Sequence, residues 1–256
     1  MDDTQTLVDR YIAVWNESEP TRRRPTVRRR ARVAELWGVG GQSLQRVLDP
    51  RGIDAITARV TLSYDKWVAG RGLRFRASGQ PQAHHDVVMC NWAMGAPDSG
   101  DVISLGLSFL LLDAGGRLHS DLQFAEPPPA PAAEHEALIE RYVALWNEPD
   151  ARRRLDRVAT LWGDHGSHVN PQTAHVGAEA ITAEAARVWA MCGALGQRFR
   201  CSGRIDGHHD AVRMDWELVD TDGVTPLAAG TNLLLLQPDG HVQRDVQFDA
   251  PAQRVG

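Results

Sequence analysis

The sequence predicts an α+β protein built from two copies of one domain in tandem. Three observations support this prediction. The 256 residues are enough for two domains with their own cores, segments of the first half return in the second, and in each half helical periodicity precedes strand periodicity. Helices followed by a run of strands are typical of the α+β class. We therefore expect each copy to curl an antiparallel sheet around its N-terminal helices.

The duplication is visible by eye. The segment RYIAVWNE returns as RYVALWNE, and LHSDLQF returns as VQRDVQF. The offset is 131 residues between Trp15 and Trp146 and settles at 124 in the strand region. Between the copies, segment 127–132 is rich in Pro and Ala, as semi-rigid linkers are. The predicted domains are therefore 1–126 and 133–256.

The elements of each copy follow from its periodicity. A first amphipathic helix is expected because apolar residues recur every three or four positions, as in RYVALW. A second, short helix ends at LWG, and a third begins at GIDAITARV or GAEAITAEA. The period then changes to two, so RFRCSG, DAVRMDWELV, AAGTNLLLLQ and HVQRDVQFD are predicted strands, with PDG as a hairpin turn.

Composition excludes several function classes. The net charge of −5 gives no electrostatic case for nucleic acid or for an anionic membrane. No apolar run approaches the roughly 20 residues of a membrane span, and the acidic start is unlike a secretory signal. The three cysteines have neither disulfide nor zinc-knuckle spacing, so we expect small core residues. We expect a cytoplasmic protein without nucleic-acid or membrane partners.

With these elements the sequence resembles the NTF2-like superfamily and, within it, the SnoaL-like, polyketide cyclase-like group. The segments that carry the resemblance are RYVALWNE, NPQTAHVGAEAI and DGHVQRDVQFD, and it covers nearly all of both copies. It implies two cone-shaped α+β barrels, each a curved antiparallel sheet wrapped on N-terminal helices around an apolar pocket. Members include polyketide cyclases, ketosteroid isomerases, epoxide hydrolases and dehydratases, and also binding proteins without chemistry.

The resemblance to ketosteroid isomerases implies roles for three positions of the second copy. Tyr142 matches their oxyanion donor in the first helix, and Asn232 matches their second donor. Asn170 replaces their aspartate base, and because an amide cannot accept a proton at useful pH, that isomerase mechanism is disfavoured. Tyr142 is equally well read as a core tyrosine. The first-copy equivalents are Tyr11, Ser108 and Gln45.

The resemblance to limonene-epoxide-hydrolase-like members implies an Asp, Arg, Asp arrangement. The second copy has Arg213 and Asp215 on one strand and Asp245 on the last strand. Residues two apart on a strand share a face, so Arg213 and Asp215 can act together in the pocket. A surface ion pair between them is the alternative. The first copy has Met89 and Asn91 at these positions and lacks the charged pair.

The last strand of this superfamily usually has a bulge, which leaves its inward face open from sequence. We expect Asp245 and Gln247 to face inward because Val246 and Phe248 suit the opposite, apolar face. The first-copy equivalents are Asp121 and Gln123.

The repeated HHD segment allows three interpretations. Neighbouring strand residues face opposite sides, so His208 and His209 do not converge on one metal, and we expect no metal site. His209, and His85 in the first copy, can instead supply an acid, base or hydrogen bond to the pocket. The third interpretation is a structural role at the start of a strand.

The leading functional hypothesis is a SnoaL-like enzyme without a cofactor. It would perform acid–base chemistry, namely cyclisation, epoxide opening or hydration, or elimination, on a small apolar oxygenated molecule such as a natural-product intermediate. The second copy would be the working pocket and the first a degenerate one. Asp245 or His209 would move the proton, while Tyr142 and Asn232 hold an oxygen. The predicted catalytic residues are Asp215, Asp245, Arg213, His209 and Tyr142, and the predicted ligand-binding residues are Asn170, Asn232, Gln247, Trp146, Tyr11, His85 and Asp121.

Two other hypotheses stay open at this point. In the first, the chain is a non-catalytic binding module whose two copies pair within the chain, as homodimers of single-domain relatives do. A homodimer of the whole chain is a further possibility. In the second, the arginine-rich insertion at 22–27 contacts an anion or an acidic partner, although a solvated helix face is the favoured explanation.

Overall fold

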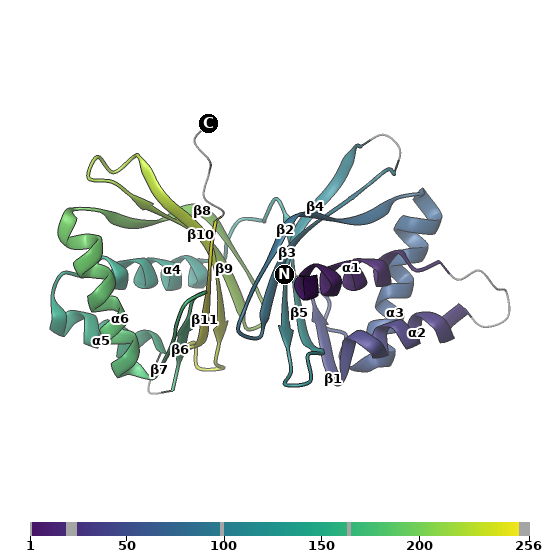
Figure 1. Cartoon of the computed structure of the whole chain (residues 1–256), viewed down its shortest axis with the longest axis horizontal. Coiled ribbons are helices and arrows are strands. Elements are labelled where there is room, and N and C mark those ends of the chain that lie inside the picture. The colour runs from purple at the N-terminus through teal and green to yellow at the C-terminus, as the bar shows by residue number, and fades with distance from the viewer. Residues whose placement is uncertain (1, 19–24, 98–99, 163–164, 251–256) are drawn as a thin grey trace. The chain divides into compact units, whose positions relative to one another are not determined.

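The computed structural model describes residues 2–18, 25–97, 100–162 and 165–250. The chain divides into two compact units, Met1–Pro127 and Pro128–Gly256. Each unit has three α-helices and a sheet of its own among these residues (Figure 1), so the predicted α+β class is confirmed. Residues 22–24 of the arginine-rich insertion lie outside the described residues.

Unit 1 places its helices before most of its strands. Its sheet has the order β1-β5-β4-β3-β2, with antiparallel pairing except between β1 and β5. Its elements are α1 (Asp2–Asn16), α2 (Pro25–Leu36), β1 (Trp37–Leu44), α3 (Gly52–Ser63), a π-helical turn η1 (Tyr64–Ala69), β2 (Arg74–His84), β3 (Val87–Gly95), β4 (Val102–Leu112) and β5 (Leu118–Glu126).

Unit 2 repeats this arrangement, with the sheet order β7-β6-β11-β10-β9-β8. Its elements are α4 (Ala133–Trp146), α5 (Ala151–Trp162), β6 (Ser167–Val169), β7 (Ala174–Val176), α6 (Ala178–Met191), a short 3-10 turn η2 (Gly193–Leu195), β8 (Arg198–His208), β9 (Ala211–Val219), β10 (Pro226–Leu236) and β11 (Val242–Asp249). The helices α4, α5 and α6 gather on one side of this sheet (Figure 1).

The short strand β7 of unit 2, which pairs with β6, was not predicted from the sequence, and neither was one further strand in each unit. This further strand follows the second helix and pairs parallel with the last strand, as β1 with β5 and as β6 with β11. The register sets Ser43 opposite Asp121 in unit 1 and His168 opposite Asp245 in unit 2. The additional strand therefore brings a polar side chain next to the buried acid of each sheet.

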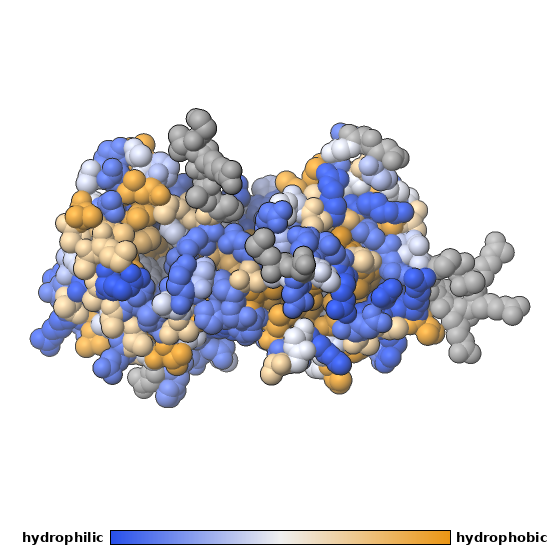
Figure 2. Space-filling model, viewed as in Figure 1, coloured by the Kyte–Doolittle hydropathy of each residue, from blue (hydrophilic) through white to orange (hydrophobic). Residues whose placement is uncertain are grey.

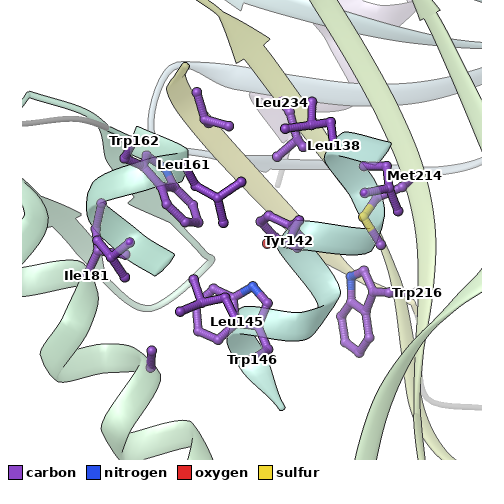
Figure 3. Close-up of a cluster of buried hydrophobic side chains, with 14 of the residues drawn as sticks. Leu138, Tyr142, Leu145, Trp146, Leu161, Trp162, Ile181, Met214, Trp216 and Leu234 are labelled. Carbon is purple, nitrogen blue, oxygen red and sulfur yellow. The ribbon is translucent and has the colours of Figure 1, made fainter. Parts of the chain in front are cut away.

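The core of unit 2 lies between α4 and the sheet. Tyr142 and Trp146 of α4 face Met214 and Trp216 of β9, and Trp162 closes the cluster from α5 (Figure 3). The Tyr142 ring packs 5.8 Å from the Trp162 ring, centroid to centroid. Burial of large aromatic side chains provides most of the stabilisation of such a core. The even-numbered residues of β9 therefore face the helices.

A bulge decides which residues of the last strand face inward. The register between β10 and β11 shifts between Leu235 and Leu236, so one residue of β11 is left unpaired. As a result Val242, which belongs to the core, and Asp245 both point toward the helices although they are three residues apart. The prediction that Asp245 and Gln247 face inward is confirmed.

A glycine in each sheet makes room for a tryptophan. A Cβ at Gly230 would collide with the Trp216 indole and with the backbone oxygen of Phe248. Gly106 has the same relation to Trp92 in unit 1. The missing side chain thus allows an indole to lie flat against the neighbouring strand.

The surface mixes hydrophilic and hydrophobic residues on the face seen in Figure 2. Some large apolar side chains are exposed, among them Val39, Val47, Leu62 and Val176. Among the described residues no helix is both long and apolar enough to cross a membrane.

Candidate functional site

Asp245 is the centre of a buried polar network in unit 2. Its carboxylate accepts hydrogen bonds from the Tyr142 hydroxyl (2.6 Å), from Nδ2 of Asn232 (2.6 Å) and from Nδ1 of His168 (2.6 Å). All four side chains are buried. Three donors compensate the carboxylate for its lost hydration. Burial and the Asp245 charge together raise the pKa of Tyr142 well above its usual value, so the phenol stays protonated.

His168 has the geometry of an oriented base. Because a carboxylate only accepts hydrogen bonds, the contact with Asp245 places the imidazole proton on Nδ1. The neutral ring then has its lone pair on Nε2, and His168 lines the cavity beside it. The ring is held from the side by Trp146, at a centroid distance of 5.0 Å. An acid that orients a histidine in this way also stabilises the imidazolium that forms when Nε2 takes a proton.

The cavity beside His168 is small, at about 150 Å³. Its walls are mostly apolar and aromatic, with a few amides and one charged pair. Glu184 and Arg187 of α6 form that pair, joined by contacts of 2.6 and 2.7 Å, and the Arg187 hydrogen bond lowers the pKa of Glu184. The other lining residues are Tyr142, Val143, Trp146, Asn170, Gln172, Val188, Phe199, Met214, Trp216, Asn232 and Gln247.

Unit 1 has a similar network with different chemistry. Asp121 accepts hydrogen bonds from Tyr11 (3.0 Å), Ser43 (2.8 Å) and Gln123 (2.6 Å). Burial raises the pKa of Asp121 to about 6, although nearby Arg59 and these hydrogen bonds act in the opposite direction. Ser43 stands where unit 2 has His168, so unit 1 has no imidazole at this position.

The cavity of unit 1 is the larger one, at about 780 Å³. Tyr11 and Gln123 line it, whereas Asp121 lies behind them with none of its surface exposed. The first copy was expected to hold the degenerate pocket, yet it has the more spacious cavity. The two units therefore differ in two properties. Unit 2 has an imidazole beside its buried acid, and unit 1 has the larger cavity.

The prediction that Arg213 and Asp215 face the pocket is wrong. They lie on the opposite side of β9 from Met214 and Trp216, which line the cavity. Asp215 accepts a hydrogen bond from Thr231 (2.7 Å) and lies 3.6 Å from Arg204. The physical reason is that the helix-facing side of β9 must be apolar, and the alternating apolar residues of this strand occupy the even positions.

The predicted placement of His209 and His85 in the pockets is also wrong. Both lie in the two-residue hairpin turn between consecutive strands, with a left-handed φ of 53°, and both are exposed. Each contacts the preceding histidine through the Nδ1 atoms at 3.0 Å. The HHD segment is thus a turn shared by the two copies, and no group of three or more potential metal ligands gathers anywhere in the described ranges.

The other residues predicted for the second copy lie at the cavity of unit 2 or in the network around Asp245. Asn170 lines the cavity, and its Oδ1 accepts hydrogen bonds from the backbone of residues 172 and 173, so it also holds a turn. Trp146 and Gln247 line the same cavity. Asn232 Nδ2 donates to both the Tyr142 oxygen (2.7 Å) and Asp245, and Tyr142 donates to Asp245. Both expected oxyanion donors are therefore occupied by the network, which disagrees with the role predicted for them.

His168 is the residue that the sequence prediction missed. It belongs to a strand of three residues, which is too short for a readable period. The available signal was its position two residues before Asn170, on the face that the family resemblance assigns to the base. Residues two apart on a strand share a face.

Similarity to known proteins was found only among solved structures. A proposed isomerase of the SnoaL-like family from Agrobacterium tumefaciens is 29% identical, with a TM-score of 0.44, and the match covers 47% of this chain and 100% of that one. An NTF2-like protein of unknown function from Exiguobacterium is 18% identical, with a TM-score of 0.36 and coverages of 47% and 98%. A proposed SnoaL-like polyketide cyclase from Jannaschia is 14% identical, with a TM-score of 0.38 and coverages of 49% and 86%.

Each of these matches covers about half of the chain, and the similarity to SnoaL-like and NTF2-like proteins is the one expected from the sequence. No protein-family model matches the chain, and no curated protein matches it. The similarity concerns the fold, so the activity has to be argued from the side chains of each unit.

Proposed function

We propose that unit 2 is an enzyme domain that transfers protons without a cofactor, with His168 as the proton acceptor. The observation that carries this proposal is the 2.6 Å contact between His168 Nδ1 and the fully buried Asp245 carboxylate, at the wall of a cavity. General base catalysis requires a base within reach of the substrate and a partner that stabilises its protonated form. His168 lines the cavity and is therefore within reach of a substrate, and Asp245 is the partner that stabilises its protonated form.

The proton path has two steps. Nε2 of His168 takes a proton from a carbon or oxygen of the substrate, and the imidazolium that forms is stabilised by the Asp245 carboxylate. The same nitrogen then returns the proton to another atom of the substrate or to a leaving group. Asp245 itself does not line the cavity, so it acts as a positioning residue and not as the acid or base that touches the substrate.

The cavity supports a small, largely apolar substrate with an oxygen function. Trp146, Phe199, Met214 and Trp216 supply apolar walls, and Asn170 is one of the few amides that can bind an oxygen. Pockets for drug-sized ligands have volumes of about 300–1,000 Å³. The cavity of about 150 Å³ is well below this range. A single small ring with one oxygen substituent is the size that we propose.

The arrangement favours ring closure or elimination initiated by proton removal over epoxide opening. Epoxide opening by an Asp, Arg, Asp set has no support, since Arg213 and Asp215 lie on the far face of β9. Glu184 is the carboxylic acid in the cavity wall, but its carboxylate is held by Arg187, whose hydrogen bond lowers the pKa of Glu184, so it stays ionised. The imidazole of His168 is thus the favoured proton carrier.

A hydrogen-exchange assay tests this proposal without knowledge of the natural substrate. Cyclopentanone and cyclohexanone would be incubated with the full chain in D₂O, and the loss of the proton signals next to the carbonyl would be followed by NMR. A positioned general base contributes about 10²- to 10⁴-fold to such a step. We expect exchange above the buffer rate, with a loss of about 100-fold or more in His168→Gln and in Asp245→Asn.

The matched control is Asp215→Asn. It makes the same chemical change in the same sheet, on the face away from the cavity. The control should keep the wild-type rate. Wild-type exchange no faster than buffer, or full activity of His168→Gln, would refute the proposed role of His168.

A further inference from the structure

The cavity of unit 1 is separate from the proposed proton-transfer site. Its volume and its lining residues indicate which kind of ligand would fit it. Its volume of about 780 Å³ falls within the range of about 300–1,000 Å³ that is usual for small-molecule pockets. Five aromatic rings line it, those of Tyr11, Trp15, Trp67, Phe75 and Trp92. Flat aromatic walls favour a flat ligand of similar breadth.

Arg59 is the charged group in this wall that lacks a full set of partners. It projects from α3, and its guanidinium carbon lies 4.7 Å from the centre of the Trp15 ring. Nη2 donates to Oε1 of Gln123 (3.0 Å). Nε and Nη1 are shielded from water and have no acceptor among the described residues. Burial lowers the pKa of Arg59, although the nearby Asp121 carboxylate acts in the opposite direction. The side chain is cationic because a guanidinium is not deprotonated in proteins.

The position of Arg59 is fixed by a chain of hydrogen bonds. Oε1 of Gln123 accepts from Gln45 (2.6 Å) as well as from Arg59. Nε2 of Gln123 donates to Tyr11 (2.9 Å) and to Asp121. With both ends of its amide engaged, Gln123 holds the guanidinium against the cavity. The carboxylate oxygens of Asp121 accept hydrogen bonds from Tyr11, Ser43 and Gln123.

The other charged side chains of the cavity wall leave its net charge positive. Lys66 lines the wall, with its ammonium 4.4 Å from the centre of the Trp67 ring. Asp49 is the acid in the wall, and it is neutralised by Arg51 through contacts of 2.8 and 2.9 Å. A poorly hydrated cation attracts an anion more strongly than the same cation in water does. The cavity wall therefore offers two cationic side chains, Arg59 and Lys66, beside aromatic rings.

The equivalent position in unit 2 has the opposite charge. Glu184 stands there, ion-paired with Arg187 (2.6 Å) and 3.5 Å from His175. Two copies of one domain thus present a cation and an acid at the same place in their cavities. This difference is expected if the two cavities take ligands of different charge.

We propose that the cavity of unit 1 binds a flat, aromatic small molecule with a carboxylate, and that Arg59 is the main recognition group for that carboxylate. The aromatic rings would stack on the indole walls, while the carboxylate supplies the hydrogen-bond acceptor that Nε and Nη1 of Arg59 lack. Unit 1 would select or hold this ligand independently of the proton transfer in unit 2.

Calorimetric titration of the full chain with 2-naphthoate and with the neutral 2-naphthamide tests this proposal. The two probes have the same rings and nearly the same shape, so the difference in affinity reports on the charge. We expect 2-naphthoate to bind at least tenfold more tightly than 2-naphthamide. We also expect Arg59→Gln to remove most of that preference and Arg59→Lys to keep part of it.

Arg30→Gln is the matched control, because Arg30 is an exposed arginine of the same unit that pairs with Asp54. It should leave both affinities unchanged. Equal affinity of the wild type for the two probes, or no binding of either, would overturn the proposal even if Arg59→Gln did not fold. A preference for naphthoate that survives in folded Arg59→Gln would overturn the role of Arg59. The ketone-exchange rate of unit 2 is measured separately, so the two proposals can fail independently.

Discussion

Asp121, the buried acid of unit 1, should make the free energy of unfolding depend on pH by a predictable amount. Asp121 has no exposed surface, and its pKa rises from 3.8 to about 6 because burial disfavours the charged form. A carboxyl with a raised pKa in the folded state binds its proton more tightly there than in the unfolded chain. The resulting stabilisation is complete below the unfolded pKa and is lost as the pH rises through about 6.

The magnitude follows from the two pKa values. Each pKa unit corresponds to about 1.4 kcal/mol. The difference between 3.8 and about 6 is therefore worth about 3 kcal/mol in full, of which about 2 kcal/mol is gained by about pH 4. Asp121→Asn removes this titration, because the amide is neutral at every pH.

The assay is urea unfolding of the full chain, monitored by tryptophan fluorescence, for the wild type and Asp121→Asn at about pH 8 and pH 4. Titrations of all other groups are common to both proteins and cancel in the difference between them. We expect the free energy of unfolding of the wild type, relative to the variant, to rise by about 2 kcal/mol between pH 8 and pH 4. A difference that stays constant would refute the raised pKa. Asp54→Asn, at an exposed carboxylate of the same unit, is the control.

Three further predictions concern the two sheets and their networks. Gly230→Val should destabilise the protein by about 3 kcal/mol or more, because the side chain would collide with Trp216; a melting temperature equal to that of the wild type would contradict this packing. Tyr142→Phe should lower the free energy of unfolding by about 1–3 kcal/mol in urea, because Asp245 loses a donor, and an unchanged value would argue against the network. His209→Asn should leave both stability and ketone exchange unchanged, since Asn tolerates a left-handed turn; a loss of exchange would restore His209 as a catalytic candidate.

Much of the fold could be predicted because its signals are long and repeated. The helices that contain Tyr11 and Tyr142 show a clear three-to-four period, and the later helix and the four long strands occur in both copies. The inward position of Asp245 could be predicted as well, because Val246 and Phe248 are apolar and need a different environment. These inferences rest on hydrophobic patterning, which burial enforces strongly.

The side chains of the site were harder to predict. Arg213 and Asp215 were placed in the pocket by family resemblance, although their alternation with Val212 and Met214 favoured the opposite face. His168 could not be placed because its partner Asp245 is 77 residues away in the chain and is brought to it only by the parallel pairing of β6 and β11. Local periodicity contains no information on such long-range pairing.

The protonation of His168 is the most direct test of the proposed proton transfer. A long-range proton–nitrogen NMR spectrum of the ring nitrogens at neutral pH would identify the tautomer, and the signal missing from His168→Gln would assign it among the 10 histidines. The contact with Asp245 requires a proton on Nδ1, and the proposed base requires a lone pair on Nε2, so the predicted result is a ring protonated at Nδ1 alone. A ring protonated at Nε2 alone would contradict the proposed base, because Nε2 would then have no lone pair to accept the substrate proton.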